Sequence, residues 1–163
     1  MVTTPDADLT MVLDILRAVP FFRELTQPEL DLLVALGRVV AYPKDMVVFR
    51  EGDQGEALYV VIRGAVRIVK QAPEVWDGTM AFVESGGCFG EMALVDDFPR
   101  SATAITQDDC TMLFLGRDAL LDLFRDEPVV GRKILAAFCR SLSLQLRQAS
   151  DRIVALASLQ RSA

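Results

Sequence analysis

Apolar residues at the start of the chain recur with the spacing of an α-helix. Between Leu9 and Val19 they lie three and four residues apart, which predicts a helix with one buried face. Pro20 interrupts this run, because a proline inside a helix removes a backbone donor and clashes with the preceding turn. Thr26-Gln27-Pro28-Glu29 has the pattern of a capping box, so a second helix is expected to begin there and to end near Gly37. Residues 1–37 are therefore expected to be mainly helical.

Between residues 38 and 116 the pattern changes to short β runs separated by turn residues. The candidate strands are 39–41, 46–49, 57–62, 65–69, 80–83, 103–105 and 111–115. Turns such as Gly52-Asp53-Gln54-Gly55 and Arg63-Gly64 lie between them. Many short strands with no helix between most of them predict an antiparallel β sandwich or barrel, and the flanking helices make the fold class α+β.

Residues 117–163 return to a helical pattern, with a short helix at 118–124 and a long one at about 129–159. In the long helix seven residues alternate spacings of four and three: Leu135, Cys139, Leu142, Leu146, Ala149, Ile153 and Leu156. An apolar seam sustained over about three heptads is typical of a coiled coil, so we expect a parallel homodimer through residues 129–159. Ile134 and Phe138, in the first turns, are expected to pack on the barrel of the same chain.

Length and charge limit the class of protein. The 163 residues are enough for one compact domain spanning 1–163. A net charge of −6 argues against a nucleic-acid partner, because phosphate neutralisation needs clustered Lys and Arg. No apolar run reaches the roughly 18–20 residues of a membrane span, and the amino terminus has no signal-peptide pattern. We therefore expect a cytoplasmic protein without a membrane partner.

The chain offers little for catalysis or metal binding. It contains no histidine, which excludes Ser-His-Asp and Cys-His arrangements. The three cysteines, Cys88, Cys110 and Cys139, are far apart and fit neither a disulfide framework nor a zinc site. We expect no catalytic residue, no metal and no enzymatic activity.

The stretch 89–104 carries the chemistry that the rest of the chain lacks. Gly90 lets the backbone come close to a ligand, and the four residues from Glu91 are long enough for one helical turn. Arg100, which follows Pro99, is the residue type suited to paired hydrogen bonds with phosphate oxygens. A carboxylate beside a phosphate would be repelled unless it faced something else, and a sugar hydroxyl is a natural partner. The residues alone therefore predict a site for a phosphate and a sugar.

The same stretch, FGEMALVDDFPRSATA, resembles the phosphate-binding cassette of the cyclic-nucleotide-binding domain family, F-G-E-(L/M)-A-L followed by P-R-(A/S/T)-A-T. This family includes regulatory subunits of protein kinase A and bacterial cyclic AMP receptor proteins. The segments Pro20–Phe22, Glu29–Leu33, Phe49–Gly55 and Tyr59–Val66 also match family patterns, so the resemblance runs from Pro20 to the final helix. It implies a small jelly-roll barrel, or double-stranded β-helix, over residues 38–116, with the cassette at 89–104.

The resemblance also implies the roles of individual residues. Its ligand-binding residues would be Phe89, Gly90, Glu91, Met92, Ala93, Arg100, Ser101 and Ala102. Arg100 would pair with the exocyclic phosphate oxygens, and Glu91 would accept a hydrogen bond from the ribose 2′-hydroxyl. Backbone N–H groups would complete the cradle of donors around the phosphate. In bacterial relatives the final helix covers the base, which points to Arg147 and Ser150 as the lid.

The implied function is that of a sensor or regulatory protein. It would bind cAMP, with cGMP as the alternative, and transmit binding through the C-terminal helix to a downstream protein effector. No basic recognition helix follows the long helix, so a DNA-binding domain is not expected. The competing hypothesis is a degenerate family member that has lost nucleotide binding and serves as a dimerisation or protein-interaction module.

Overall fold

The computed structural model describes residues 2–3, 9–70 and 78–160, with the backbone alone at 2–3, 93, 152 and 155–160. The helices are α1 (Leu9–Ala18), the 3₁₀ turn η1 (Pro20–Phe22), α2 (Gln27–Leu36), the 3₁₀ turn η2 (Glu91–Leu94), α3 (Arg117–Asp126) and α4 (Pro128–Gln160). The strands are β1 (Val2–Thr3), β2 (Arg38–Tyr42), β3 (Val47–Phe49), β4 (Ala57–Arg63), β5 (Ala65–Val69), β6 (Thr79–Glu84), β7 (Cys88–Phe89), β8 (Thr103–Thr106) and β9 (Cys110–Gly116).

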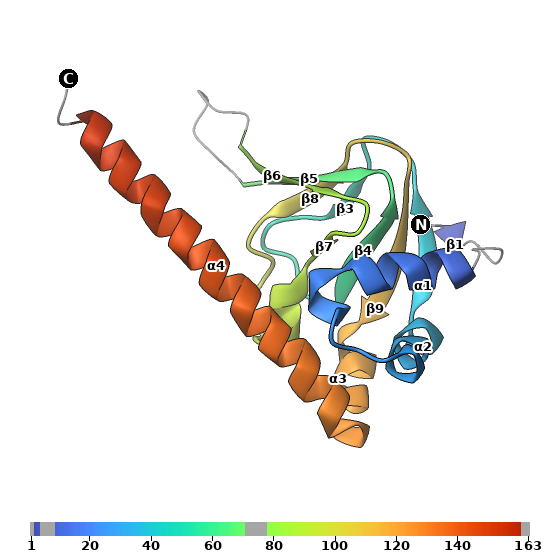
Figure 1. Ribbon diagram of the computed structural model, residues 1–163. Coiled ribbons are helices and arrows are strands. Elements are labelled where there is room, and N and C mark those ends of the chain that lie inside the picture. The colour runs from blue at the N-terminus through green and yellow to red at the C-terminus, as the bar shows by residue number, and fades with distance from the viewer. Residues whose placement is uncertain (1, 4–8, 71–77, 161–163) are drawn as a thin grey trace.

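The strands form two antiparallel sheets that face each other in a jelly roll (Figure 1). One sheet has the order β1-β2-β9-β4-β7 and the other β3-β8-β5-β6. Several neighbours in the sheets are far apart in the chain, as where β4 pairs with β9 through Leu58 and Leu115. The α+β class and the jelly roll predicted from the pattern and the resemblance are confirmed.

Strand β4 is buried on both faces, which explains why residues 57–62 read as one continuous apolar run. Leu58, Val60 and Ile62 pack against the helices, whereas Tyr59 and Val61 point into the space between the two sheets. The molecule therefore has two cores that share one strand.

The N-terminal helices begin and end where the pattern predicts. The N–H of Thr26 donates to the Glu29 carboxylate at 2.6 Å, which is the glutamate half of a capping box. The N–H of Gly37 donates to the Leu33 carbonyl at 3.0 Å and closes the last turn of α2. Leu16, Phe22 and Leu33 are almost fully buried, so these helices cover the outer face of the first sheet.

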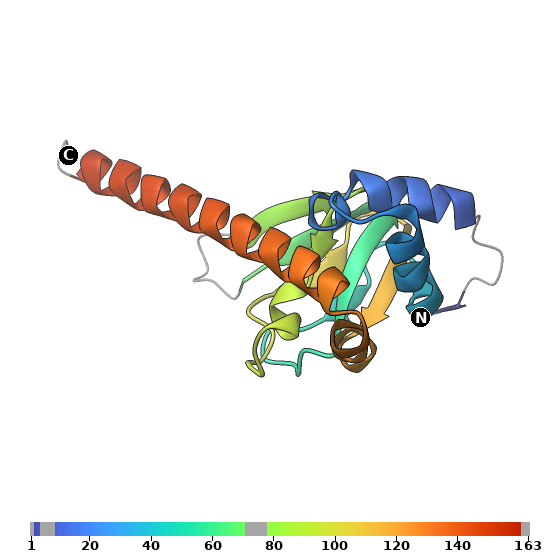
Figure 2. The ribbon, with the colours of Figure 1, turned by 60° about the horizontal axis from the view of Figure 1, so that its bottom comes forward.

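Helix α4 is anchored at its beginning and projects from the domain over the rest of its length (Figures 1 and 2). Val130, Ile134 and Phe138 are buried, and the Phe138 ring lies 5.9 Å from that of Phe21. The prediction that the first turns pack on their own domain is confirmed. From Leu142 onward every described side chain is exposed.

Two strands were missed by the pattern, and several predicted ends differ by a residue or two. β1 and β7 have two residues each, too short for alternation to appear in the sequence. β7 exists because Phe89 and Cys88 pair with Tyr59 and Val60 of β4. A pattern within β7 alone cannot predict this pairing. β7 also leads directly into the segment that carries the candidate chemistry.

Candidate ligand site in the β7–β8 segment

Gly90 turns the chain from β7 into the η2 turn. Its φ of 77° lies in the left-handed region that favours glycine. A Cβ at this position would lie 2.7 Å from the Arg100 guanidinium and 3.0 Å from the Ala57 carbonyl oxygen. Gly90 is therefore required both by its conformation and by the arginine that fills the space beside it.

Arg100 is buried, with 8% of its surface exposed. Its Nη1 donates to the Gly90 carbonyl at 2.9 Å and its Nη2 to the Ala57 carbonyl at 2.8 Å. The guanidinium carbon lies 4.1 Å from the centre of the Phe49 ring, a cation–π contact. The Nε N–H is buried and has no hydrogen-bond partner among the described residues, and such a donor is the kind of group that an oxyanion would satisfy.

An aromatic cluster forms the floor under Arg100. Phe49, Tyr59 and Phe89 lie with ring centres 5.2–6.0 Å apart, and Phe114 meets Tyr59 edge-on. Burial in these apolar surroundings lowers the pKa of Arg100 from its ordinary value, which the negative groups nearby oppose. An arginine keeps its charge in proteins, so the cluster presents a fixed cation in a low-dielectric site.

Glu91 opens η2 and is half-buried on the same side of the domain. Burial raises the pKa of its carboxyl group, while its own backbone N–H and the charge of Arg100 act in the opposite direction. The ion pairs between described residues include none between Glu91 and Arg100. The two charges thus act on each other without forming an ion pair, so each can still contact a third group through its remaining hydrogen-bonding positions.

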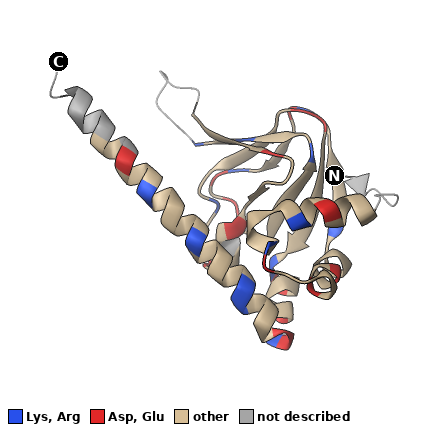
Figure 3. Cartoon of the chain, viewed as in Figure 1, with Lys and Arg blue, Asp and Glu red and all other residues tan. Residues whose placement is uncertain are grey.

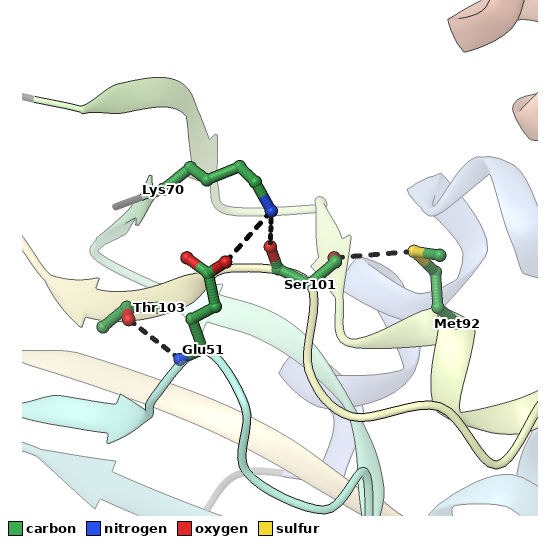
Figure 4. A network of polar contacts seen from close by, with 5 residues as sticks. All are labelled: Glu51, Lys70, Met92, Ser101 and Thr103. Atoms are coloured by element: carbon green, nitrogen blue, oxygen red, sulfur yellow. Dashed lines mark hydrogen bonds and ion pairs between the residues drawn. The ribbon is translucent and has the colours of Figure 1, made fainter. Parts of the chain in front are cut away.

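The other cassette residues surround this pair. Phe89 is buried in the aromatic floor, Ala102 is 7% exposed, and the Ala93 backbone lies within η2. Met92 is exposed, and the Ser101 hydroxyl donates to its sulfur at 3.6 Å (Figure 4). A thioether is a weak acceptor, so the Ser101 hydroxyl could exchange this contact for a stronger one.

The turn at residues 50–53 clamps the main chain of Arg100. The Gly52 N–H donates to the Arg100 carbonyl at 2.9 Å, and the Arg100 N–H donates to the Asp53 carbonyl at 2.7 Å. The Asp53 carboxylate accepts the Arg50 N–H at 2.7 Å and so holds the turn itself. These bonds connect two sequence motifs, 49–55 and 89–104, that lie far apart in the chain.

The structure does not bring Arg147 and Ser150 to this site. Both are exposed on the projecting half of α4, and the Ser150 hydroxyl donates to the Leu146 carbonyl of its own helix at 2.9 Å. Figure 1 shows this part of α4 running away from the sheets. Their role as a lid stays a prediction.

Sequence reasoning missed three groups that hold the arginine and its neighbours. The Phe49 ring and the Ala57 carbonyl contact Arg100, and the Lys70 ammonium contacts Ser101. Phe49 lies in a motif that was noted, but nothing in the sequence says that its ring meets Arg100. Among the described residues no group of three or more Cys, Asp or Glu side chains is arranged to hold a metal.

The fold and the site together define a class of protein: jelly-roll domains in which a glycine leads into a 3₁₀ turn and a buried arginine lies beside that glycine. The chain belongs to the cyclic nucleotide-binding domain family, whose sequence model matches residues 39–127. The resemblance noted in the sequence is thereby confirmed.

The relatives are bacterial and eukaryotic regulators. The chain is 36% identical over 123 residues to the cyclic AMP receptor protein of Thermus thermophilus, covering 76% of this chain and 57% of that protein. It resembles a cyclic nucleotide-binding domain from Methylobacillus flagellatus, with a TM-score of 0.75, 30% identity, and 89% and 82% of the two chains covered. It also resembles the regulatory domain of Toxoplasma gondii PKA, crystallised with cAMP, with a TM-score of 0.66 and 29% identity. That match covers 74% of this chain and 46% of the other.

The chain spans 46–57% of the length of the first bacterial relatives that it matches. In the part of the chain that the structure describes, no helix has the length and apolar character to cross a membrane.

Proposed function

We propose that this protein is a cyclic-nucleotide-binding sensor that takes cAMP in the cradle between Glu91 and Arg100. The observation that carries the proposal is the Arg100 guanidinium, which is buried and held by two carbonyls, and whose Nε N–H has no partner in the part of the chain that the structure describes. The cAMP named for relatives such as the Thermus receptor favours this ligand, with cGMP as the alternative.

Each part of the ligand has a proposed partner. Arg100 supplies charge-assisted hydrogen bonds to the exocyclic phosphate oxygens, and the aromatic floor strengthens them by excluding water. Glu91, the first residue of η2, accepts a hydrogen bond from the ribose 2′-hydroxyl. Backbone N–H groups of residues 90–93 and of Ala102 complete the phosphate cradle, with the Ser101 hydroxyl beside them.

The remaining parts of the proposal concern how binding is transmitted. Residues 1–163 act as one domain, and two copies associate in parallel through residues 129–159. Arg147 and Ser150 close over the base when α4 moves, so that ligand binding changes the position of the helix. The protein then acts on a downstream protein effector in the cytoplasm and performs no chemistry on its ligand.

Calorimetry with cAMP and cGMP on Arg100→Ala and Arg100→Lys tests the proposal. Loss of a buried charge-assisted phosphate contact should weaken binding by about 2–5 kcal/mol in Arg100→Ala. Arg100→Lys keeps a cation and a donor for the carbonyls but loses the planar fork, so we expect intermediate affinity.

Arg125→Ala is the matched control, because Arg125 is exposed on α3 and pairs only weakly with Asp122 of the same helix. It should bind as the wild type does. Equal affinity of Arg100→Ala and wild type would mean that the ligand lies elsewhere. A wild-type protein that dimerises but binds neither nucleotide would be the interaction module of the competing hypothesis.

A further inference from the structure

Lys70 directly follows β5, and its ammonium reaches the cassette at Ser101. Side chains alternate between the faces of a strand. Val66 and Ile68 of β5 both pack into the core between the sheets, whereas Lys70 follows the strand and its side chain is 46% exposed. The Lys70 N–H donates to the Gly78 carbonyl at 2.8 Å, which holds its main chain in place beyond the strand.

The Lys70 ammonium joins two segments that are distant in the sequence (Figure 4). It donates to the Ser101 carbonyl at 2.8 Å and to the Glu51 carboxylate at 3.1 Å. The Glu51 N–H in turn donates to the Thr103 hydroxyl oxygen at 2.9 Å. Lys70 therefore ties the end of β5 to the 50–53 turn and to the exit of the cassette at once.

This position matters because Ser101 directly follows the candidate phosphate-binding arginine. The backbone of Arg100 is clamped by the 50–53 turn, and Lys70 holds the next peptide group from the side of β5. Ser101 and Ala102 can present a hydroxyl and an N–H to a phosphate only if this peptide keeps its orientation. A residue that orders it before the ligand arrives lowers the entropic cost of binding.

We propose that Lys70 is a positioning residue for cyclic-nucleotide binding, which acts through the Ser101 carbonyl and Glu51 rather than by touching the ligand. The inference rests on the proposed function. Lys70 and Glu51 side chains are 46% and 30% exposed, so their ion pair contributes little to the stability of the fold. The effect of Lys70 should appear in ligand affinity.

Lys70→Met and Lys70→Arg, measured by calorimetry with cAMP, test this role. Lys70→Met keeps the apolar stem and loses the donors, so Kd should rise about three- to ten-fold, as for loss of a partly exposed charged hydrogen bond. Lys70→Arg can still donate to both acceptors and should restore Kd to within about two-fold of the wild type. Lys44→Met is the matched control, because the Lys44 side chain is exposed in the turn before β3 and should leave Kd unchanged.

Two further measurements separate positioning from other causes. In the ligand-free protein, amide resonances of residues 100–103 should shift in Lys70→Met and return in Lys70→Arg, while the melting temperature stays close to that of the wild type. In Glu51→Gln/Lys70→Met the losses of affinity should be less than additive, because both residues belong to one bridge.

The inference is overturned if Lys70→Met binds cAMP as the wild type does, or if Lys70→Arg is as weak as Lys70→Met. A wild-type protein that binds no cyclic nucleotide would instead overturn the proposed function, and the inference with it.

Discussion

Burial acts against the charge of both ionisable residues in the cradle. The pKa of Arg100 is lowered and that of Glu91 is raised, in each case with loss of hydration as the largest cause. An arginine remains charged after such a shift, because its ordinary pKa is far above neutrality. A glutamate has no comparable reserve, so Glu91 is the residue whose state should depend on pH.

Glu91→Gln should raise the free energy of unfolding of the ligand-free protein at pH 7 and weaken cAMP binding. A carboxyl group whose pKa is raised in the folded state binds protons more tightly there than when unfolded. Its ionisation therefore destabilises the fold at pH values above the raised pKa. This effect vanishes as the pH falls below the pKa that the carboxyl group has in the unfolded chain. Urea unfolding at neutral and acidic pH should show the advantage of the variant at neutral pH only.

The ligand affinity of the wild type should fall in acid, because Glu91 becomes protonated and the ribose hydroxyl can no longer donate its hydrogen bond to a carboxylate anion. In Glu91→Gln this component of the pH dependence should be absent. Glu84→Gln, at an exposed position of β6, is the control and should change neither quantity. A Glu91→Gln variant that is less stable than the wild type at pH 7 would contradict the argument.

At the scale of the element, the projecting half of α4 carries apolar residues that no other described part of the chain covers. The seam residues Leu142, Leu146 and Ile153 are 37%, 69% and 67% exposed, and the side chain of Leu156 lies outside those that the structure describes. Helices in proteins gain most of their stability from the packing of an apolar face, so a projecting helix with such a seam favours a second helix beside it.

Leu146→Asp should convert a dimer into a monomer, because it places a charge in the centre of the proposed seam. Light scattering at micromolar concentration measures the change. Leu144→Asp is a closely matched control: Leu144 is 57% exposed on the same helix but lies off the seam. A monomeric wild type, or equal dissociation by both variants, would refute the proposed dimer.

At the scale of the whole molecule, α4 is a basic helix on an acidic chain. Its sequence contains Arg132, Lys133, Arg140, Arg147 and Arg152, whereas the net charge of the chain is −6. Figure 3 shows blue positions along the described part of this helix. Lys133 pairs with Glu29 of α2 at 2.7 Å with both side chains largely buried, and Arg140 pairs with Glu24 at 2.6 Å on the surface. The Lys133 pair therefore joins α4 to the capping residue of α2 and is the stronger of these two links.

Saturating cAMP should alter hydrogen exchange of residues 129–159, because α4 packs on α3 and α3 contacts η2 of the cassette. Lys133→Met should speed exchange at the start of α4 in the free protein, since it leaves Glu29 without the group that lowers its pKa most. Arg140→Met removes only an exposed pair and should leave exchange close to that of the wild type. Exchange in α4 that ignores the ligand would refute transmission through this helix.

The local pattern was sufficient for elements whose cause is local. The Thr26–Glu29 capping box, the stop at Gly37 and the break at Pro20 appear where the sequence predicts them, because each depends on residues within one or two turns. The 89–104 cassette was recognised for the same reason: its glycine, carboxylate and arginine lie close together in the chain. By contrast, the sequence did not predict β7, nor the contacts of the Phe49 ring and the Ala57 carbonyl with Arg100.

The sequence by itself determined the order of the main helices and of every described strand except β1 and β7. It also determined the family and the two charged residues on which the proposal depends. Tertiary structure alone decided that Arg100 is buried, that carbonyls of Gly90 and Ala57 hold it, and that Lys70 reaches Ser101 from another strand. The physical reason is the separation along the sequence of the residues that each interaction joins. Capping and periodicity act over a few residues. The Lys70–Ser101 and Arg100–Ala57 bonds join residues 31 and 43 positions apart, so they form only when distant segments meet in the folded sheets.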